Sequence, residues 1–559
     1  MKSLPIVGLA SLLLVGCLDS EFGAGHQGGP LVPPHGRRTH PHGHPPAPSD
    51  GDHHQGHDAG HASGLDGGFG CSPESDAGVP HMDASAHDAA APHGDAGARD
   101  AGGEADASTP EEDGGSGCGF VPSWDADAGA LSATWGSPRT IERNPAQGDP
   151  SDFAPQVALR PNGDGMIVFY GANNQYQEGI WASHYVRSTN ALSAPVRVDD
   201  AATRGVNPLI AIDDCGNAVV LWNTLSSTNI LIRRYRAGHG WQQIEPVVTL
   251  EPGRAQITMF ALAGSPQGDF AAAWSAWSHE SDGGYPAFAR FLQPNEGFGP
   301  VIDLSGPDRY ATIAAVAVGR VASKLRLAAS WTQSTGSSLQ ARASIVEVDG
   351  PLGAPTVISD QAVDQSALAD DIAMDSAGNV FATAMGRGSR DDRVSVRQFV
   401  NQTWSATQTL SGPGEIQVRR PSLSVTPGGH AMVAWAECWS DCSIWSSTFS
   451  NGHWAVRTEI PAPKSNTGEA PRVRLLDDGR ALVMWGGFLN YKESVYASEF
   501  RPGSGWATGH LLESEDDKGN GAVIDLDFSA AGTGVGVWVH EVAGDAGSYA
   551  RTIQTAVYR

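Results

Sequence analysis

Residues 208–222 read PLIAIDDCGNAVVLW, two short apolar runs separated by a polar turn at 213–217. Apolar runs of this length on either side of a Gly-containing turn predict a β-hairpin. Gly216 tolerates a positive φ, and Asp and Asn side chains can bond their own backbone, which is why such residues occupy turns. The stretch therefore predicts two adjacent antiparallel strands.

The same hairpin recurs along the chain. Similar stretches stand at 155–170, 257–274, 311–331, 370–384, 421–435, 471–485 and 522–538. The second strands end at Phe169, Trp222, Trp274, Trp331, Ala384, Trp435, Trp485 and Trp538, at intervals of 50 to 57 residues. A steady period of this length indicates repeated supersecondary units arranged as a stack or a ring.

Each repeat also has a second half. A third strand such as 230–236 is followed by a turn and a fourth strand, which often begins with Trp, as at Trp241, Trp404, Trp454 and Trp506. Four antiparallel strands in about fifty residues make one blade of a β-propeller. The sequence predicts an all-β fold with a single β-propeller of eight four-stranded blades over residues 131–559, with seven blades as the alternative.

The two ends of the repeat region complement each other. The last repeat stops after three strands at Arg559, and a spare strand stands in front of the first repeat at 133–142. Pairing these two segments would complete the last blade and remove two open sheet edges. We therefore expect an N-terminal strand to close the ring.

The turns and flanking strands, for example Asp477-Asp478-Gly479 before ALVMW, resemble the Tol-B-like and NHL-like repeats and, loosely, the sialidase-like superfamily. The resemblance covers residues 131–559 and implies a propeller. The sialidase Asp box places Ser, Asp, Gly and Trp at S-x-D-x-G-x-x-W. This chain departs from it, because Asp375 and Gly378 are three residues apart and Trp222 follows Asp213 by nine.

The N-terminus predicts export and anchoring. Residues 1–16 contain a short apolar run, too short to span a bilayer, and are typical of a signal peptide. Leu14-Val15-Gly16-Cys17 resembles the lipobox of bacterial lipoproteins, which implies cleavage before Cys17 and lipidation of that residue. Leu18 in the next position favours the outer membrane. We expect a lipid-anchored, monomeric protein of the cell outer membrane, periplasmic or surface-exposed.

Residues 17–130 are rich in Gly, Ala, Asp, His and Pro, and they predict a disordered tether. This segment carries 19 Asp and Glu against 3 Arg, which is more than half of the net charge of −26. Twelve of the 19 histidines also lie here. The histidines that provide the densest set of imidazole metal ligands are His40, His42, His44, His53, His54, His57 and His61. Metal capture by these residues and a plain polar spacer both remain open.

Cysteines and turn carboxylates have structural explanations. Cys438 and Cys442 flank a three-residue loop and are expected to form a disulfide in an oxidising compartment, whereas we expect Cys215 to be a free thiol. The turn carboxylates are Asp213, Asp214, Asp375, Asp477 and Asp478. They lack the alternating oxygen ligands of a Ca²⁺ loop, so we expect them to cap the turn backbone.

The functional prediction is recognition of a protein or a polysaccharide. No nucleophile, phosphate-binding, dinucleotide or zinc-protease motif is present, so the sequence predicts neither an enzyme nor a cofactor. The periodic Trp residues are expected to pack between blades, whereas Trp181, Trp277, Trp439 and Trp445 fall outside the period and are candidates for ligand stacking. Net negative charge argues against nucleic acid. A sialidase-like glycan-cleaving enzyme is the alternative; it requires Arg and carboxylate side chains that converge on one face of the propeller.

Overall fold

The computed structural model describes residues 133–559 except for several loops. The omitted loop residues are 143–153, 173–177, 203, 252–254, 279–283, 294–296, 307–309, 349, 351, 389–390, 415, 464–470, 490–491, 514–518 and 544–548. All described residues belong to the unit Asp113–Arg559. The signal peptide, Cys17 and the seven candidate metal-binding histidines lie outside the described residues, so the expectations about them stay predictions.

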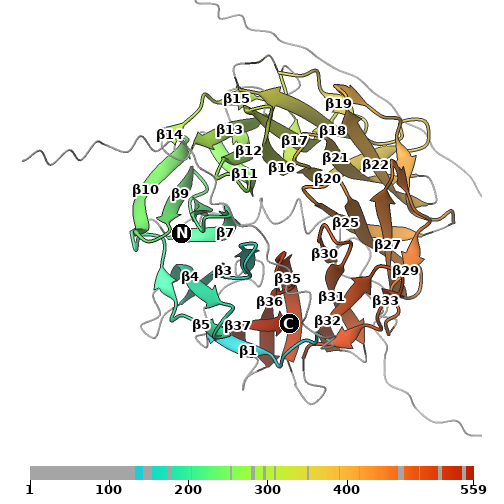
Figure 1. The fold of residues 1–559 in the computed structure, drawn as a ribbon. Coiled ribbons are helices and arrows are strands. Elements are labelled where there is room, and N and C mark those ends of the chain that lie inside the picture. Colours follow the sequence, from blue (N-terminus) through green and yellow to red (C-terminus); the bar gives the residue numbers. More distant parts are fainter. Residues whose placement is uncertain are drawn as a thin grey trace, which may run out of the picture. The chain divides into compact units, whose positions relative to one another are not determined.

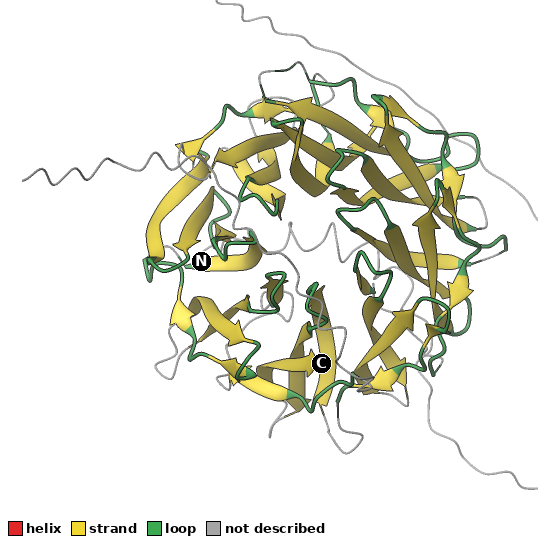
Figure 2. Cartoon of the chain, viewed as in Figure 1, coloured by secondary structure: helices red, strands yellow, loops and turns green. Residues whose placement is uncertain are grey.

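Eight antiparallel sheets form an eight-bladed β-propeller, which excludes the seven-bladed alternative. Figure 1 shows the sheets arranged in a ring that the chain follows in sequence order. The described part of the chain is built from strands and loops without any helix, as Figure 2 shows. It follows that no described helix has the length and hydropathy needed to cross a membrane.

The strands occupy corresponding positions in successive blades. The innermost strands are β2 (Gln156–Leu159), β7 (Gly205–Ile212), β11 (Ala255–Gly264), β16 (Ala311–Val321), β20 (Ser366–Met374), β25 (Gln417–Val425), β30 (Arg472–Leu475) and β35 (Gly519–Phe528). The second strands are β3 (Gly165–Ala172), β8 (Ala218–Thr224), β12 (Phe270–Ser278), β17 (Lys324–Ser334), β21 (Val380–Arg387), β26 (Ala431–Cys438), β31 (Ala481–Leu489) and β36 (Gly534–Ala543).

The third strands are β4 (Glu178–Val186), β9 (Asn229–Arg236), β13 (Ala287–Gln293), β18 (Leu339–Glu347), β22 (Asp392–Val400), β27 (Cys442–Ser450), β32 (Lys492–Arg501) and β37 (Tyr549–Tyr558). The outermost positions hold β1 (Arg139–Glu142), β5 (Ala191–Leu192), β6 (Val196–Arg197), β10 (Gly240–Thr249), β14 (Gly297–Phe298), β15 (Ile302–Asp303), β19 (Thr356–Val357), β23 (Thr403–Trp404), β24 (Gln408–Thr409), β28 (His453–Trp454), β29 (Thr458–Glu459), β33 (Gly505–Trp506) and β34 (His510–Leu511). In five blades the fourth strand is split into two short pieces that both pair with the third strand.

The hairpin at 208–222 forms as predicted, with β7 and β8 on either side of its turn. Gly216 has φ 88°, in the left-handed region that disfavours a side chain. The Asp213 carboxylate accepts hydrogen bonds from the Asn217 backbone N–H at 2.7 Å and from the Asn217 side-chain amide at 2.8 Å. Asp375 and Asn379 repeat this arrangement at 2.8 and 2.7 Å. These carboxylates therefore cap their turns.

Large apolar side chains of the second strands pack between blades. Every residue of β8 is buried, and the Trp222 ring lies against Gly205 and belongs to the same buried cluster as Ile180 of the preceding blade. The periodic residues Trp222, Trp274, Trp331, Trp435, Trp485 and Trp538 are each at most 2% exposed. Burying one such side chain contributes roughly 1.5–3 kcal/mol of stability. The prediction that these Trp residues pack between blades is confirmed.

The N-terminal strand closes the ring. β1 pairs antiparallel with β37, with Arg139 opposite Thr555. Just before β1, Trp135 forms an isolated bridge with Tyr558, and their ring centroids are 5.6 Å apart. The last blade therefore consists of one strand from the front of the repeat region and three from its end, as the sequence predicts.

Candidate functional site

Polar side chains on the innermost strands bond the backbone of the next blade. The Val473 N–H donates to Ser422 Oγ at 3.2 Å, and the Leu475 N–H donates to Ser424 Oγ at 2.9 Å. An innermost strand has one open edge, and its buried N–H groups need acceptors. The serines of one blade thus satisfy the edge of the following blade.

The same arrangement joins the last blade to the first. Asp525 Oδ2 accepts a hydrogen bond from the Val157 N–H at 2.9 Å, and Asp527 Oδ2 accepts one from the Leu159 N–H at 2.7 Å. These contacts join residues 368 positions apart in the sequence. They supplement the pairing of β1 with β37 as a second connection across the closing seam.

Arg472 and Arg474 occupy the equivalent positions on β30, where a guanidinium group cannot accept an N–H. Arg474 Nε instead lies 3.3 Å from Asp527 Oδ1, and Arg472 Nε lies 4.0 Å from Asp525 Oδ1. Asp527 Oδ1 also accepts a hydrogen bond from the N–H of Phe528 at 2.9 Å. The motif RVRL on one blade is thereby matched by DLDF on the next.

Asp371 of β20 belongs to the same set of charged groups. Its carboxylate accepts hydrogen bonds from the N–H of Leu423 at 3.0 Å and from its neighbour Ile372 at 2.9 Å. Burial raises the pKa of Asp371 above its ordinary value, while these hydrogen bonds and the charge of Arg474 oppose the increase. Burial likewise raises the pKa of Asp525 against the charges of Arg474 and Arg472.

Arg and carboxylate side chains that converge on one face are the feature expected of a sialidase-like enzyme. The sequence alone did not reveal that these residues come together. Arg472 and Arg474 converge with Asp371, Asp525 and Asp527 on the innermost strands. The signal was present as alternating SLS, RVR and DLD at one position of three successive repeats. Each of the three carboxylates, however, accepts two backbone N–H groups, which gives all of them a structural task.

A groove with a volume of about 670 Å³ lies between the fifth and sixth blades. It lies beside the turns that join the first strand to the second and the third strand to the fourth. Its lining residues are Asp375, Ser376, Ala377, Asn379, Phe381, Gln398, Val400, Thr403, Ser405, Pro427, Gly428, Gly429, Phe449 and Gly452. Ligand sites typically have volumes of 300–1,000 Å³.

Hydrogen bonds within and between the two blades hold the polar wall of the groove in place. Asp375 is buried against Asn379, as described above, and Ser376 Oγ donates to the Pro427 carbonyl of the next blade at 2.7 Å. Ser405 Oγ accepts a hydrogen bond from the Gln398 N–H at 3.1 Å. The half-buried Gln398 side-chain amide has no hydrogen-bond partner in the described part of the chain. Gln398 therefore offers both a donor and an acceptor to the groove.

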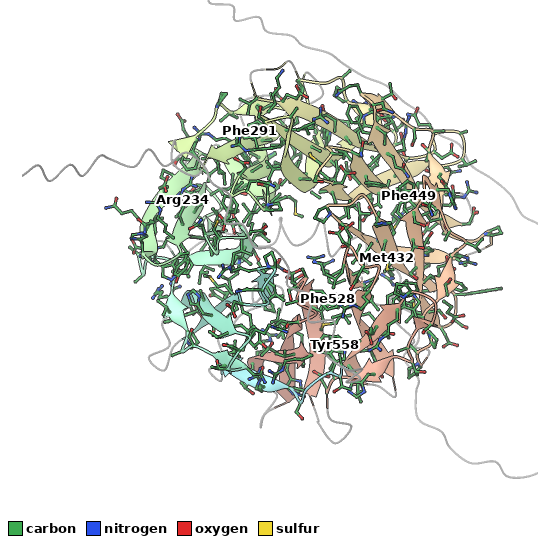
Figure 3. All side chains as sticks on the ribbon, in the orientation of Figure 1. Arg234, Phe291, Met432, Phe449, Phe528 and Tyr558 are labelled. Atoms are coloured by element: carbon green, nitrogen blue, oxygen red, sulfur yellow. A yellow bond between two sulfur atoms is a disulfide. The ribbon has the colours of Figure 1, made fainter. Side chains whose placement is uncertain are left out.

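Aromatic rings form the apolar part of the groove. Phe381 of β21 and Phe449 of β27 meet edge to face, with ring centroids 5.1 Å apart. Trp454 packs against Phe449 at 5.4 Å on the side of the sixth blade. Phe381 is buried, whereas the half-buried Phe449, labelled in Figure 3, keeps part of its ring available to the groove. Sequence reasoning found neither Gln398 nor Phe449, because the groove arises from two blades about fifty residues apart.

The four candidate stacking residues lie on three different blades and do not form one site. Trp181 is on β4 with the Arg197 guanidinium 5.9 Å from its ring centre, and Trp445 is on β27 with the Arg457 guanidinium 4.0 Å from its ring centre. Trp277 lies near the end of β12. Trp439 is 83% exposed in the loop after β26. None of the four lines the groove.

A disulfide joins Cys438 and Cys442, with the sulfur atoms 2.06 Å apart. It closes the loop that carries Trp439. Cys215 is also disulfide-bonded, so the expectation of a free thiol is wrong. Because Cys438 and Cys442 pair with each other, the partner of Cys215 lies outside the described residues.

Within the described ranges, His, Cys, Asp and Glu side chains form no group of three that could hold a metal ion.

No family model and no curated protein matches this chain. Among solved structures, it is similar to a PL25 ulvan lyase at 9% identity and a TM-score of 0.41, covering 65% of this chain and 95% of that one. It is also similar to the BP39L lectin from Burkholderia pseudomallei, at 10% identity and a TM-score of 0.41. That match covers 65% of this chain and 99% of the lectin. The polysaccharide lyase Uly1 matches at 9% identity and a TM-score of 0.40. That match covers 75% of this chain and 92% of the lyase. Likeness at this level carries no argument about function.

Proposed function

We propose that this chain is a lipid-anchored recognition protein of the cell envelope that binds a polysaccharide in the groove between its fifth and sixth blades. The observation that carries the proposal is the groove itself, with its volume of about 670 Å³. A sugar ring presents hydroxyl groups at its rim and C–H groups on its face. The fixed polar wall of the groove can bond the hydroxyl groups, and the partly exposed aromatic ring can pack against the C–H groups. The lipid anchor rests on the lipobox-like residues 14–17.

Binding is favoured over catalysis because of how the carboxylates are used. A glycosidase of the common two-carboxylate kind needs one carboxyl group free to transfer a proton and a second one free to act on the opposite side of the bond. Asp371, Asp525 and Asp527 are bound to backbone N–H groups, and Asp375 in the groove is held by Asn379. The groove therefore has the features of a binding site without a free pair of acid and base.

The test is a thermal-unfolding screen of the full chain against cell-wall and capsular polysaccharides, with reaction products checked in each sample. A ligand present at a hundred times its dissociation constant stabilises the folded state by about 2.7 kcal/mol, which raises the melting temperature measurably. Stabilisation without cleavage supports the proposal. Cleavage would establish the enzyme alternative instead.

The location of the site is tested with two matched variants. Thr403 lines the groove at the start of β23, and His453 holds the same place in β28 but does not line it. Both residues are exposed. Thr403→Trp should block the groove and abolish the stabilisation by the polysaccharide, while His453→Trp should leave it unchanged. Equal stabilisation of both variants would place the site elsewhere.

A further inference from the structure

The groove carries almost no charge. Among its fourteen lining residues, Asp375 is the one ionisable side chain, and no Lys, Arg or His is present. Asp375 is 7% exposed, and both of its oxygens accept hydrogen bonds from Asn379. Next to the groove, the exposed Asp477 accepts a hydrogen bond from the N–H of Gly428 at 3.0 Å. The one charged side chain in the lining is therefore negative, and so is the neighbouring Asp477.

Two arginines adjoin lining residues, and their guanidinium groups are held by backbone carbonyls and, for Arg326, by Glu347. Arg326 donates to the Gly378 carbonyl at 2.9 Å and pairs with Glu347 at 2.6 Å. Arg397 donates to the carbonyl of Ser405 at 2.7 Å and to that of Val357 at 2.5 Å. Neither guanidinium lines the groove. A carboxylate or sulfate on a ligand would find no cationic side chain among the lining residues.

We infer that the groove selects neutral carbohydrate over uronic-acid or sulfated polymers, and that Gln398 is a specificity-determining residue. The inference rests on the proposed function, since it names the class of polysaccharide bound at the same site. Gln398 is the cross-strand partner of Phe381, which places an uncharged amide next to the aromatic part of the groove. An amide both donates and accepts a hydrogen bond, as a sugar hydroxyl does. An acidic sugar would meet the negative charge of Asp375 with no cationic side chain in the lining to offset it.

The experiment measures binding by the full chain of neutral hexasaccharides and of an acidic one. The neutral probes are maltohexaose, cellohexaose, xylohexaose and laminarihexaose, and the acidic probe is hexagalacturonate. We expect at least one neutral probe to bind at least tenfold more tightly than hexagalacturonate, with an affinity that does not change between 50 and 500 mM salt. Gln398→Lys should raise the affinity for hexagalacturonate at least tenfold and make it salt-dependent. Gln398→Ala should weaken neutral binding without improving acidic binding.

The outcomes separate the two proposals. If hexagalacturonate binds the unaltered chain as tightly as any neutral probe, and Thr403→Trp abolishes that binding, the charge selection is wrong while the groove stands. If Gln398→Lys gains no affinity for hexagalacturonate, the assigned role of Gln398 is wrong. If no hexasaccharide binds, or if the binding is unchanged in Thr403→Trp, the proposed function is wrong. The proposed selectivity is then wrong as well, because it concerns the same site. Melting curves of each variant without ligand establish that it is folded.

Discussion

The carboxylate of Asp525 accepts a hydrogen bond from the Val157 N–H at 2.9 Å, across 368 residues of sequence. Both residues are at most 5% exposed. The contact joins the innermost strand of the last blade to that of the first. The ring is thus joined by edge-strand hydrogen bonds at the centre of the propeller as well as by the added strand at its rim.

Removing this carboxylate should destabilise the protein strongly. Asp525→Ala leaves the buried Val157 N–H without its acceptor and Arg472 without its nearest carboxylate, so we expect the free energy of unfolding to fall by about 2–4 kcal/mol. Asp525→Asn keeps an acceptor oxygen and should lose less. Urea denaturation measures both effects. As a control, Asp478→Ala breaks the exposed pair with Arg480 and should cost under about 1 kcal/mol. If Asp525→Ala lowered the unfolding free energy as little as Asp478→Ala does, the proposed role of the Asp525–Val157 contact would be wrong.

The raised pKa values of Asp371 and Asp525 predict a pH dependence of stability. A carboxyl group with a higher pKa in the folded state binds its proton more tightly there, so its contribution favours folding most at low pH. That contribution is lost as the pH rises from the ordinary value of 3.8 through the folded pKa. The unfolding free energy of Asp371→Asn, relative to the unaltered chain, should therefore increase over this interval. A relative stability that stays level or falls would refute the burial effect.

The N-terminal strand can be tested by truncation. A chain that begins at residue 143 lacks β1 and Trp135, and it leaves the edge of β37 unpaired. We expect a lower melting temperature and association through the open edge, measured by calorimetry and by light scattering. The control begins at Asp113, the start of the unit that contains the propeller, and keeps β1. Identical melting temperatures of the two chains would show that β1 is dispensable.

The Cys438–Cys442 disulfide and the Trp439 that it encloses should have separable effects. Replacing both cysteines by Ala removes the closure of a five-residue loop, and we expect the unfolding free energy to fall by about 2 kcal/mol. Trp439→Ala should change it by less than about 0.5 kcal/mol, because the indole is 83% exposed. Denaturation of the two variants in parallel checks the difference. Equal losses would mean that the indole stabilises the loop through contacts of its own.

The repeat pattern predicted most of the fold because its signals are local. Turn residues such as Gly216 and Asp213, and the alternation within each hairpin, act over fewer than ten residues, so the sequence reveals them directly. The spare strand at 133–142 predicted closure because a missing strand at one end matched an extra strand at the other. The expectation about Cys215 was wrong, since a disulfide depends on which distant thiol comes close, and the turn sequence carries no information about that.

By itself, the sequence determined the repeated four-stranded units and the buried Trp series, because both follow from a period of about fifty residues, and the closing strand, because the two ends match. The tertiary structure decided between eight blades and seven. Only the tertiary structure decided which side chains meet between blades. It placed Arg474 beside Asp527, and it brought Gln398 and Phe449 into one groove. The reason is physical: the faces of adjacent blades pack against each other, so the partners of a residue depend on the relative placement of two sheets. Strand periodicity leaves that placement undefined.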